Sequence, residues 1–295
     1  MRNSSTTARI VTGLIGLLVT PVAIGLVFFG GLIWLQRLGA LSQDMPPADL
    51  LTVRVLLQLL GLLLLAGVVV TGIWSSAGLI AAGVLSLVPI AAALFPAVLL
   101  EIYRAAPSAI RPAVDALTYG HALLLLVAMG AGGIALALAR RAPAGGEGGI
   151  GVLGLVLAPL LLALSAWLLP TGLASGQLEF LRTYRTEPQL LSILAVLAGV
   201  ALLVTAVLLT RWSSWALILP AALLLLGTVP TMVPEMLRML PRDLYTIVVP
   251  LLVTGGGVAM AVVFVVHAFV IAKVRRSAAP AAPDAADPAA YPVAA

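Results

Sequence analysis

The sequence contains no cysteine and very few charged residues. Of its 295 residues 9% are charged and 62% are hydrophobic, whereas an average soluble domain has about 25% and about 45–50%. The absence of cysteine excludes disulfides, thiolate metal sites, iron–sulfur clusters and cysteine nucleophiles. Because so few charges cannot cover a water-facing surface, the composition predicts an integral membrane protein.

Histidine is also scarce, since His121 and His267 are the two in the chain. This argues against haem pairs and multi-histidine metal centres, and no nucleophile elbow, P-loop or zinc-binding helix motif is present. Every carboxylate lies in a predicted loop or tail. We therefore expect no enzymatic activity, no cofactor and no metal, and an enzyme at the outer face is only a third hypothesis. The net charge of +5 comes from scattered basic residues, which predicts no nucleic-acid partner.

Long apolar runs fill most of the chain. Runs of about 18 or more apolar residues indicate membrane-spanning helices, because hydrocarbon requires each backbone polar group to be satisfied within its own segment. The first run follows Arg2 and Arg9 and is longer than the apolar core of a signal peptide, so we interpret it as a retained span. The predicted fold is all-α and polytopic, with eight spans at 10–35, 54–74, 76–100, 120–139, 150–170, 190–210, 213–233 and 246–272.

An internal repeat organises these spans. Gly13–Pro21 reads GLIGLLVTP and Gly151–Pro159 reads GVLGLVLAP. Two predicted hairpins, Trp74-Ser75-Ser76 and Trp212-Ser213-Ser214, are separated by the same number of residues as these two segments. We interpret the chain as two tandem parallel four-helix repeats about an axis along the membrane normal, because an even number of spans preserves orientation. The alternative is chance similarity between apolar segments.

The predicted organisation has four parts. Residues 1–141 and 150–276 form the two membrane repeats, and an Ala/Gly-rich linker at 142–149 joins them. The Ala/Pro-rich tail, 277–295, is too poor in large apolar residues to form a core and is predicted to be disordered. Basic residues divide equally between the two faces of this topology, so orientation depends on their positions. Because Arg9, Arg140/Arg141 and Lys273/Arg275/Arg276 adjoin span ends, both termini are predicted to be cytoplasmic. Abundant Ala, Leu, Val and Gly with one lysine suggests a bacterial plasma membrane.

The candidate functional residues lie in the predicted outer loops. Three loops contain Glu-x-x-Arg, a spacing that places both charges on one helical face; the pairs are Glu101/Arg104, Glu179/Arg182 and Glu235/Arg238. They are interpreted either as a rim that binds a partner or lipid headgroups, or as local anchors of interfacial helices that neutralise their own charge. We favour the second interpretation. The two Trp-Ser-Ser hairpins mark the repeat.

The spans themselves contain prolines and glycines but no Asp or Glu. The missing carboxylates argue against proton-coupled machinery, and His121 and His267 are expected to be hydrogen-bonded interface residues. Proline-broken helices can line a transport cavity, although kinks used for packing are commoner. Our first hypothesis is therefore a non-enzymatic scaffold or accessory subunit that packs against membrane lipids or other membrane proteins. The alternative is a transporter or lipid-handling permease with a cavity between the two repeats.

Overall fold

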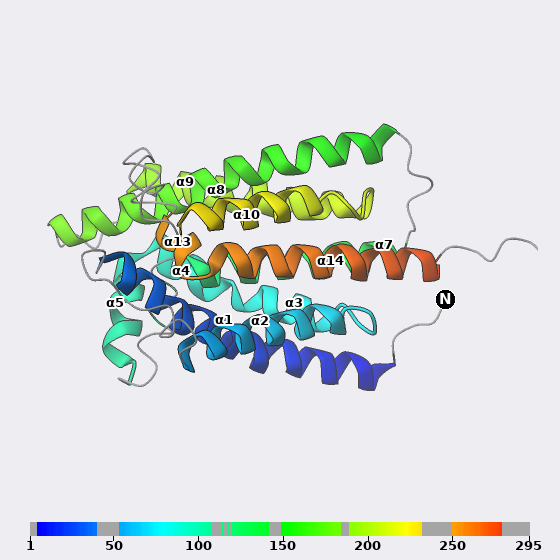
Figure 1. The fold of residues 1–295 in the computed structure, drawn as a ribbon, viewed down its shortest axis with the longest axis horizontal. Helices are drawn as coiled ribbons and strands as arrows, with labels where there is room; N and C mark the ends of the chain where they lie inside the picture. The colour runs from blue at the N-terminus through cyan, green and yellow to red at the C-terminus, as the bar shows by residue number, and fades with distance from the viewer. Residues whose placement is uncertain are drawn as a thin grey trace, which may run out of the picture.

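The structure, a computed structural model, describes residues 5–39, 53–107, 114, 117, 120–141, 149–183, 189–231 and 249–278. Within these residues every regular element is a helix, and seven helical segments are long and apolar enough to cross a bilayer. Figure 1 shows the long helices running side by side in one bundle. The prediction of an all-α, polytopic membrane protein is confirmed.

The first half of the chain contains three long helices and a segmented one. Pro21 lies inside a continuous helix, because a missing N–H removes one hydrogen bond and leaves the rest of the ladder in place. Phe95, in contrast, adopts an extended conformation (φ −127°, ψ 96°), and Pro96 begins the next helix. The helices are α1 (Thr6–Gly39), α2 (Val53–Thr71), α3 (Ala77–Leu85), α4 (Leu87–Leu94), α5 (Pro96–Ala105) and α7 (His121–Arg141).

The second half follows a similar order. One continuous helix runs through both Pro159 and Pro170 without a break. A short 3-10 turn follows α9, and the last span is interrupted at Thr254–Gly255, where Gly255 has φ +91°. The elements are α8 (Gly149–Thr183), α9 (Leu190–Leu208), η3 (Leu209–Arg211), α10 (Ile218–Thr231), α13 (Val249–Val253) and α14 (Gly256–Ala278).

Several predicted boundaries differ from the observed ones. Helices α1 and α8 continue past positions 35 and 170 to Gly39 and Thr183, so each is much longer than the roughly 20 residues that a bilayer crossing needs. The third predicted span is 76–100, and the apolar helical segment observed there ends at Leu94. Of the seventh, 213–233, the structure describes residues up to Thr231, and 14 of them form α10. The described residues thus contain seven candidate spans where the sequence predicts eight.

The linker and the tail lie mostly outside the described residues. Helix α8 begins at Gly149 and α14 ends at Ala278, so the described part of the chain includes neither 142–148 nor 279–295. The predicted disorder of the tail stays a prediction.

Two helices form the centre of the bundle. The membrane-spanning window of α7 is 83% buried and that of α14 is 61% buried, whereas the window of α8 is 22% buried. Helix α7 contacts α14, and each also contacts the second helix of the other half, so α7 packs on α9 and α14 on α2. The helix pairs α1–α2 and α8–α9 pack on either side of this centre (Figure 1).

The two ends of the bundle carry different charges. In Figure 1 the start of α1, the α2–α3 and α9–α10 turns, and the ends of α7 and α14 lie at one end, while α5 lies at the other. We call the first the basic end, because its described residues include seven basic side chains and no Asp or Glu: Arg9, Arg140, Arg141, Arg211, Lys273, Arg275 and Arg276.

Candidate functional site

The structure describes one of the three predicted Glu-x-x-Arg pairs in full. On α5, Arg104 donates to Glu101 at 2.7 Å, and both side chains are about two-thirds exposed. An exposed pair of this kind contributes only about 0.2–1 kcal/mol. The contact neutralises both charges on the same short helix, as expected of a local anchor.

The other two pairs cannot be compared with it. Glu179 and Arg182 fall within α8, but their side chains lie outside the described residues. Glu235 and Arg238 lie outside them entirely. A rim that brings the three pairs together therefore stays a prediction.

The first Trp-Ser-Ser motif lies in the turn between α2 and α3. Trp74 is 60% exposed, whereas Ser75 is buried and its Oγ accepts a hydrogen bond from the backbone N–H of Ala77 at 3.2 Å. Arg140 from the end of α7 donates to the backbone carbonyls of Gly72 and Ile73. Both carbonyls follow Thr71, the last residue of α2, so this arginine caps the α2–α3 turn and fixes α7 against it.

The second Trp-Ser-Ser motif has a matching arginine. Arg275, near the end of α14, donates to the backbone carbonyl of Trp212 at 3.3 Å, and the guanidinium of Arg211 lies 5.6 Å from the centre of the Trp212 ring. From the sequence, Arg140 and Arg275 were predicted only to set the orientation in the membrane. Their position at the end of the fourth span of each predicted repeat was the signal that could have identified the caps.

Both histidines are hydrogen-bonded and buried inside the bundle, and their depth in the bilayer stays a prediction. His121 is 1% exposed and its Nε2 is 2.7 Å from Oγ1 of Thr254; His267 is 3% exposed and its Nε2 is 3.3 Å from Oγ1 of Thr210. Among the described residues neither imidazole contacts a carboxylate. The arrangement pairs neutral polar groups that would otherwise be costly to bury.

A polar cluster surrounds the interruption before α14. Gln58 of α2 accepts a hydrogen bond from Nε1 of Trp34 at 3.2 Å, and a Cβ at Gly255 would overlap the Gln58 amide. Gly31 of α1 lies directly against the backbone of Thr254. The interruption therefore joins α1, α2 and α7 to the second half, and no sequence motif predicted it.

The centre of the bundle is filled by close helix contacts. Gly83 of α3 and Gly130 of α7 approach so closely that a Cβ on Gly83 would lie 2.5 Å from the Cα of Gly130. A Cβ on Gly132 would lie 3.0 Å from the ring of His267 on α14. Small residues at such crossings let helix backbones touch, as is typical of packing in lipid.

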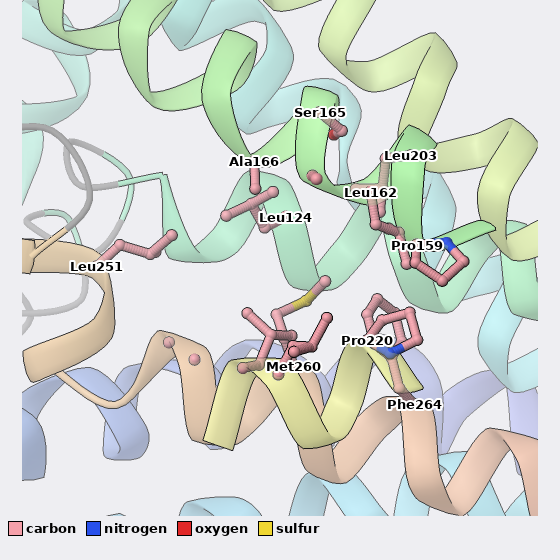
Figure 2. A pocket seen from close by; sticks show the side chains of 15 residues that line it. Leu124, Pro159, Leu162, Ser165, Ala166, Leu203, Pro220, Leu251, Met260 and Phe264 are labelled. Atoms are coloured by element: carbon pink, nitrogen blue, oxygen red, sulfur yellow. The ribbon is translucent and has the colours of Figure 1, made fainter. Parts of the chain in front are cut away.

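A cavity of about 190 Å³ lies off the centre, between α8 and α10. Helices α7, α9, α13 and α14 complete its wall, so all but one of its lining residues come from the second half. Figure 2 shows Pro159 and Pro220 on opposite sides of the opening, with Met260 and Phe264 of α14 beside them. Of the lining side chains only Ser165 carries a polar group, and its Oγ already donates to the Gly199 carbonyl at 2.8 Å.

Chemically, the described residues offer packing surfaces and an apolar cavity. No group of three or more His, Asp or Glu that could hold a metal ion occurs among them. Comparison with protein-family models, with curated proteins and with solved structures finds no match to this chain.

Proposed function

We propose that the protein is a non-enzymatic scaffold or accessory subunit of the bacterial plasma membrane that packs against other membrane proteins or lipids. The observation that supports this most is the filled centre, where α7 is 83% buried and contacts α14. A transporter with its path on the axis between two halves needs a polar cavity there. Among the described residues, close glycine contacts and His–Thr pairs join α7 and α14 to their neighbours, which supports a packed centre.

The proposed architecture has eight spans in two parallel four-helix repeats. The pairing of contacts supports it, because α2–α14 and α9–α7 are equivalent contacts under exchange of the halves. The arginine caps support it as well, since Arg140 reaches the turn after α2 and Arg275 reaches the turn after α9. The eighth crossing would consist of α10 and the residues that follow it.

Both termini are proposed to be cytoplasmic. The basic end supports this, because basic residues near span ends are retained on the cytoplasmic side. Cysteine labelling in this cysteine-free chain tests it: Ser213→Cys in the α9–α10 turn should react with an impermeant thiol reagent only after the membrane is opened. Gln177→Cys and Leu240→Cys should react in intact cells. The opposite pattern would invert the topology, and protection of Leu240→Cys together with Ser213→Cys would remove the crossing between them.

Site-directed photo-crosslinking in native membranes tests the scaffold function. A benzoylphenylalanine is placed at one exposed position on each outer helix, with the buried Phe28 as the control: Leu18, Leu63, Leu160, Leu191 and Leu226. A scaffold predicts a discrete protein adduct from positions on one contiguous face and none from Phe28. Lipid adducts alone at all five positions would contradict a protein partner.

A lipid-handling permease is the second candidate, and the cavity between α8 and α10 favours it. The purified protein is reconstituted into vesicles that carry a fluorescent phospholipid, and dithionite is added to quench the outer leaflet. A scaffold leaves about half of the fluorescence protected, as in protein-free vesicles. Quenching beyond that half, with the vesicles still sealed, would favour the permease.

A further inference from the structure

The two halves differ at one helix contact. In the first half α1 and α3 touch, because Gly16 and Gly78 bring their backbones together; a Cβ on Gly16 would lie 2.7 Å from the carbonyl carbon of Gly78. In the register that aligns the two Trp-Ser-Ser motifs, the corresponding positions are Gly154 and Ala216. A Cβ on Gly154 would meet nothing closer than 3.8 Å. Helices α8 and α10 are therefore splayed where α1 and α3 are closed, and the cavity occupies the resulting space.

The cavity opens sideways, towards the surroundings of the bundle. Leu223 of α10 lines it and is 54% exposed, and Ala163 and Ala166 of α8 line it from exposed positions. Its inner wall is buried, since Met260 is 6% exposed and Phe264 is 1% exposed. The cavity thus connects the outer surface of α8 and α10 with buried side chains, and Figure 2 shows Met260 and Phe264 among the residues that line it.

The chemistry of the wall selects the occupant. Leucine, alanine, proline, methionine and phenylalanine side chains offer no hydrogen bonds, and the Ser165 hydroxyl is already used. An apolar cavity of about 150 Å³ holds a benzene-sized hydrocarbon and excludes water, so about 190 Å³ suffices for a short length of hydrocarbon chain. It is far too narrow for a helix, whose diameter with side chains is about 10–12 Å.

We propose that this cavity is a binding site for one acyl chain of a membrane lipid, inserted between α8 and α10. The bilayer supplies acyl chains at high local concentration, and an inserted chain regains the dispersion contacts that an empty cavity forfeits. The inference goes beyond the proposed function, because a scaffold and a permease could both hold such a lipid. If no acyl chain binds in the cavity, the results expected from the photo-crosslinking and dithionite-quenching experiments do not change.

Photolabelling of the full-length protein tests the site. The protein is reconstituted in vesicles of phosphatidylethanolamine and phosphatidylglycerol that contain a trace of phosphatidylethanolamine with a diazirine midway along one acyl chain. After irradiation, mass spectrometry locates the labelled peptides. We expect adducts at Met260 and Phe264, which are too buried for the general lipid surroundings to label. Adducts confined to exposed positions such as Leu160 and Leu226 would overturn the proposal.

Filling the cavity provides the matched variants. Ala163→Leu and Ala166→Leu add bulk at the opening, and each should reduce labelling of Met260 and Phe264 at least fivefold. Ala222→Leu adds the same bulk at an exposed position of α10 that does not line the cavity, and should leave labelling within twofold of the original. Equal labelling in all variants would overturn the proposal, as would crosslinking of the cavity to a second protein chain. If Ala163→Leu or Ala166→Leu fails to fold, the positions labelled in the unmodified protein still test whether an acyl chain enters the cavity.

Discussion

The difference between the α1–α3 and α8–α10 contacts gives a quantitative prediction for one pair of matched variants. Gly16→Ala places a Cβ 2.7 Å from the carbonyl carbon of Gly78, where ordinary contact begins at 3.4 Å, so the two backbones must separate. Overpacking of this kind costs about 1–3 kcal/mol. Gly154→Ala makes the corresponding change in α8, where the nearest atom is 3.8 Å away. Both variants gain the same helix propensity, about 0.8–1 kcal/mol, so their difference isolates the contact.

Thermal unfolding of the purified variants in detergent measures this difference. At about 2–4 °C per kcal/mol for a chain of this size class, Gly16→Ala should melt about 2–12 °C below Gly154→Ala. Gly13→Ala, on the same helix with nothing within 4 Å of its Cβ, serves as a second control and should behave like Gly154→Ala. Equal melting temperatures for Gly16→Ala and Gly154→Ala would refute the claim that the two halves pack differently here.

Three further predictions concern the polar contacts. Arg140→Gln removes the charged hydrogen bonds to the α2–α3 turn and should lower the free energy of unfolding by about 1.5–3 kcal/mol, whereas the exposed neighbour variant Arg141→Gln should change it by less than about 0.5 kcal/mol. Thr254→Val leaves the buried His121 imidazole without its hydroxyl partner and should cost about 1–3 kcal/mol; a double-mutant cycle with His121→Phe that shows no coupling would contradict this contact. Gly255→Ala forces a side chain into φ +91° and should cost about 1–3 kcal/mol, measured by the same thermal unfolding; an unchanged melting temperature would show that this backbone conformation is not required.

The sequence predicts the spans well because their physical cause is local. In hydrocarbon each backbone group must bond within its own helix, so a long apolar run is sufficient evidence for α2, α7 or α9. The same constraint explains why α1 continues through Pro21 and α8 through Pro159: losing one hydrogen bond is cheaper than unwinding the chain in lipid. Pro21 and Pro159 therefore do not break their helices, whereas the break in the last span occurs at Thr254–Gly255, after Pro250.

The candidate site was less predictable because it depends on contacts between distant segments. The His121–Thr254 bond joins residues 133 positions apart, and the Arg140 cap reaches back 68 positions to Gly72. Neither distance follows from periodicity or composition. The cavity is harder still, since it arises from the separation of two helices and its lining residues are ordinary apolar types. In the sequence, the difference between the halves is visible as Gly78 in the first and Ala216 at the corresponding position of the second.

The cavity between α8 and α10 is compatible with a stable bundle. Where glycine stands at position 78, α1 and α3 pack closely; where alanine stands at position 216, just before α10, helices α8 and α10 touch much less than α1 and α3 do. Helices in a membrane gain little from the hydrophobic effect when they associate, because lipid tails are as apolar as the side chains they replace. A loosened contact that fills with an acyl chain therefore costs far less in a bilayer than a cavity of the same size would cost in a water-soluble core. The contacts of α7 with α14 and α9, and of α14 with α2, hold the halves together independently of that contact, so α8 and α10 are free to take up lipid without loss of the fold.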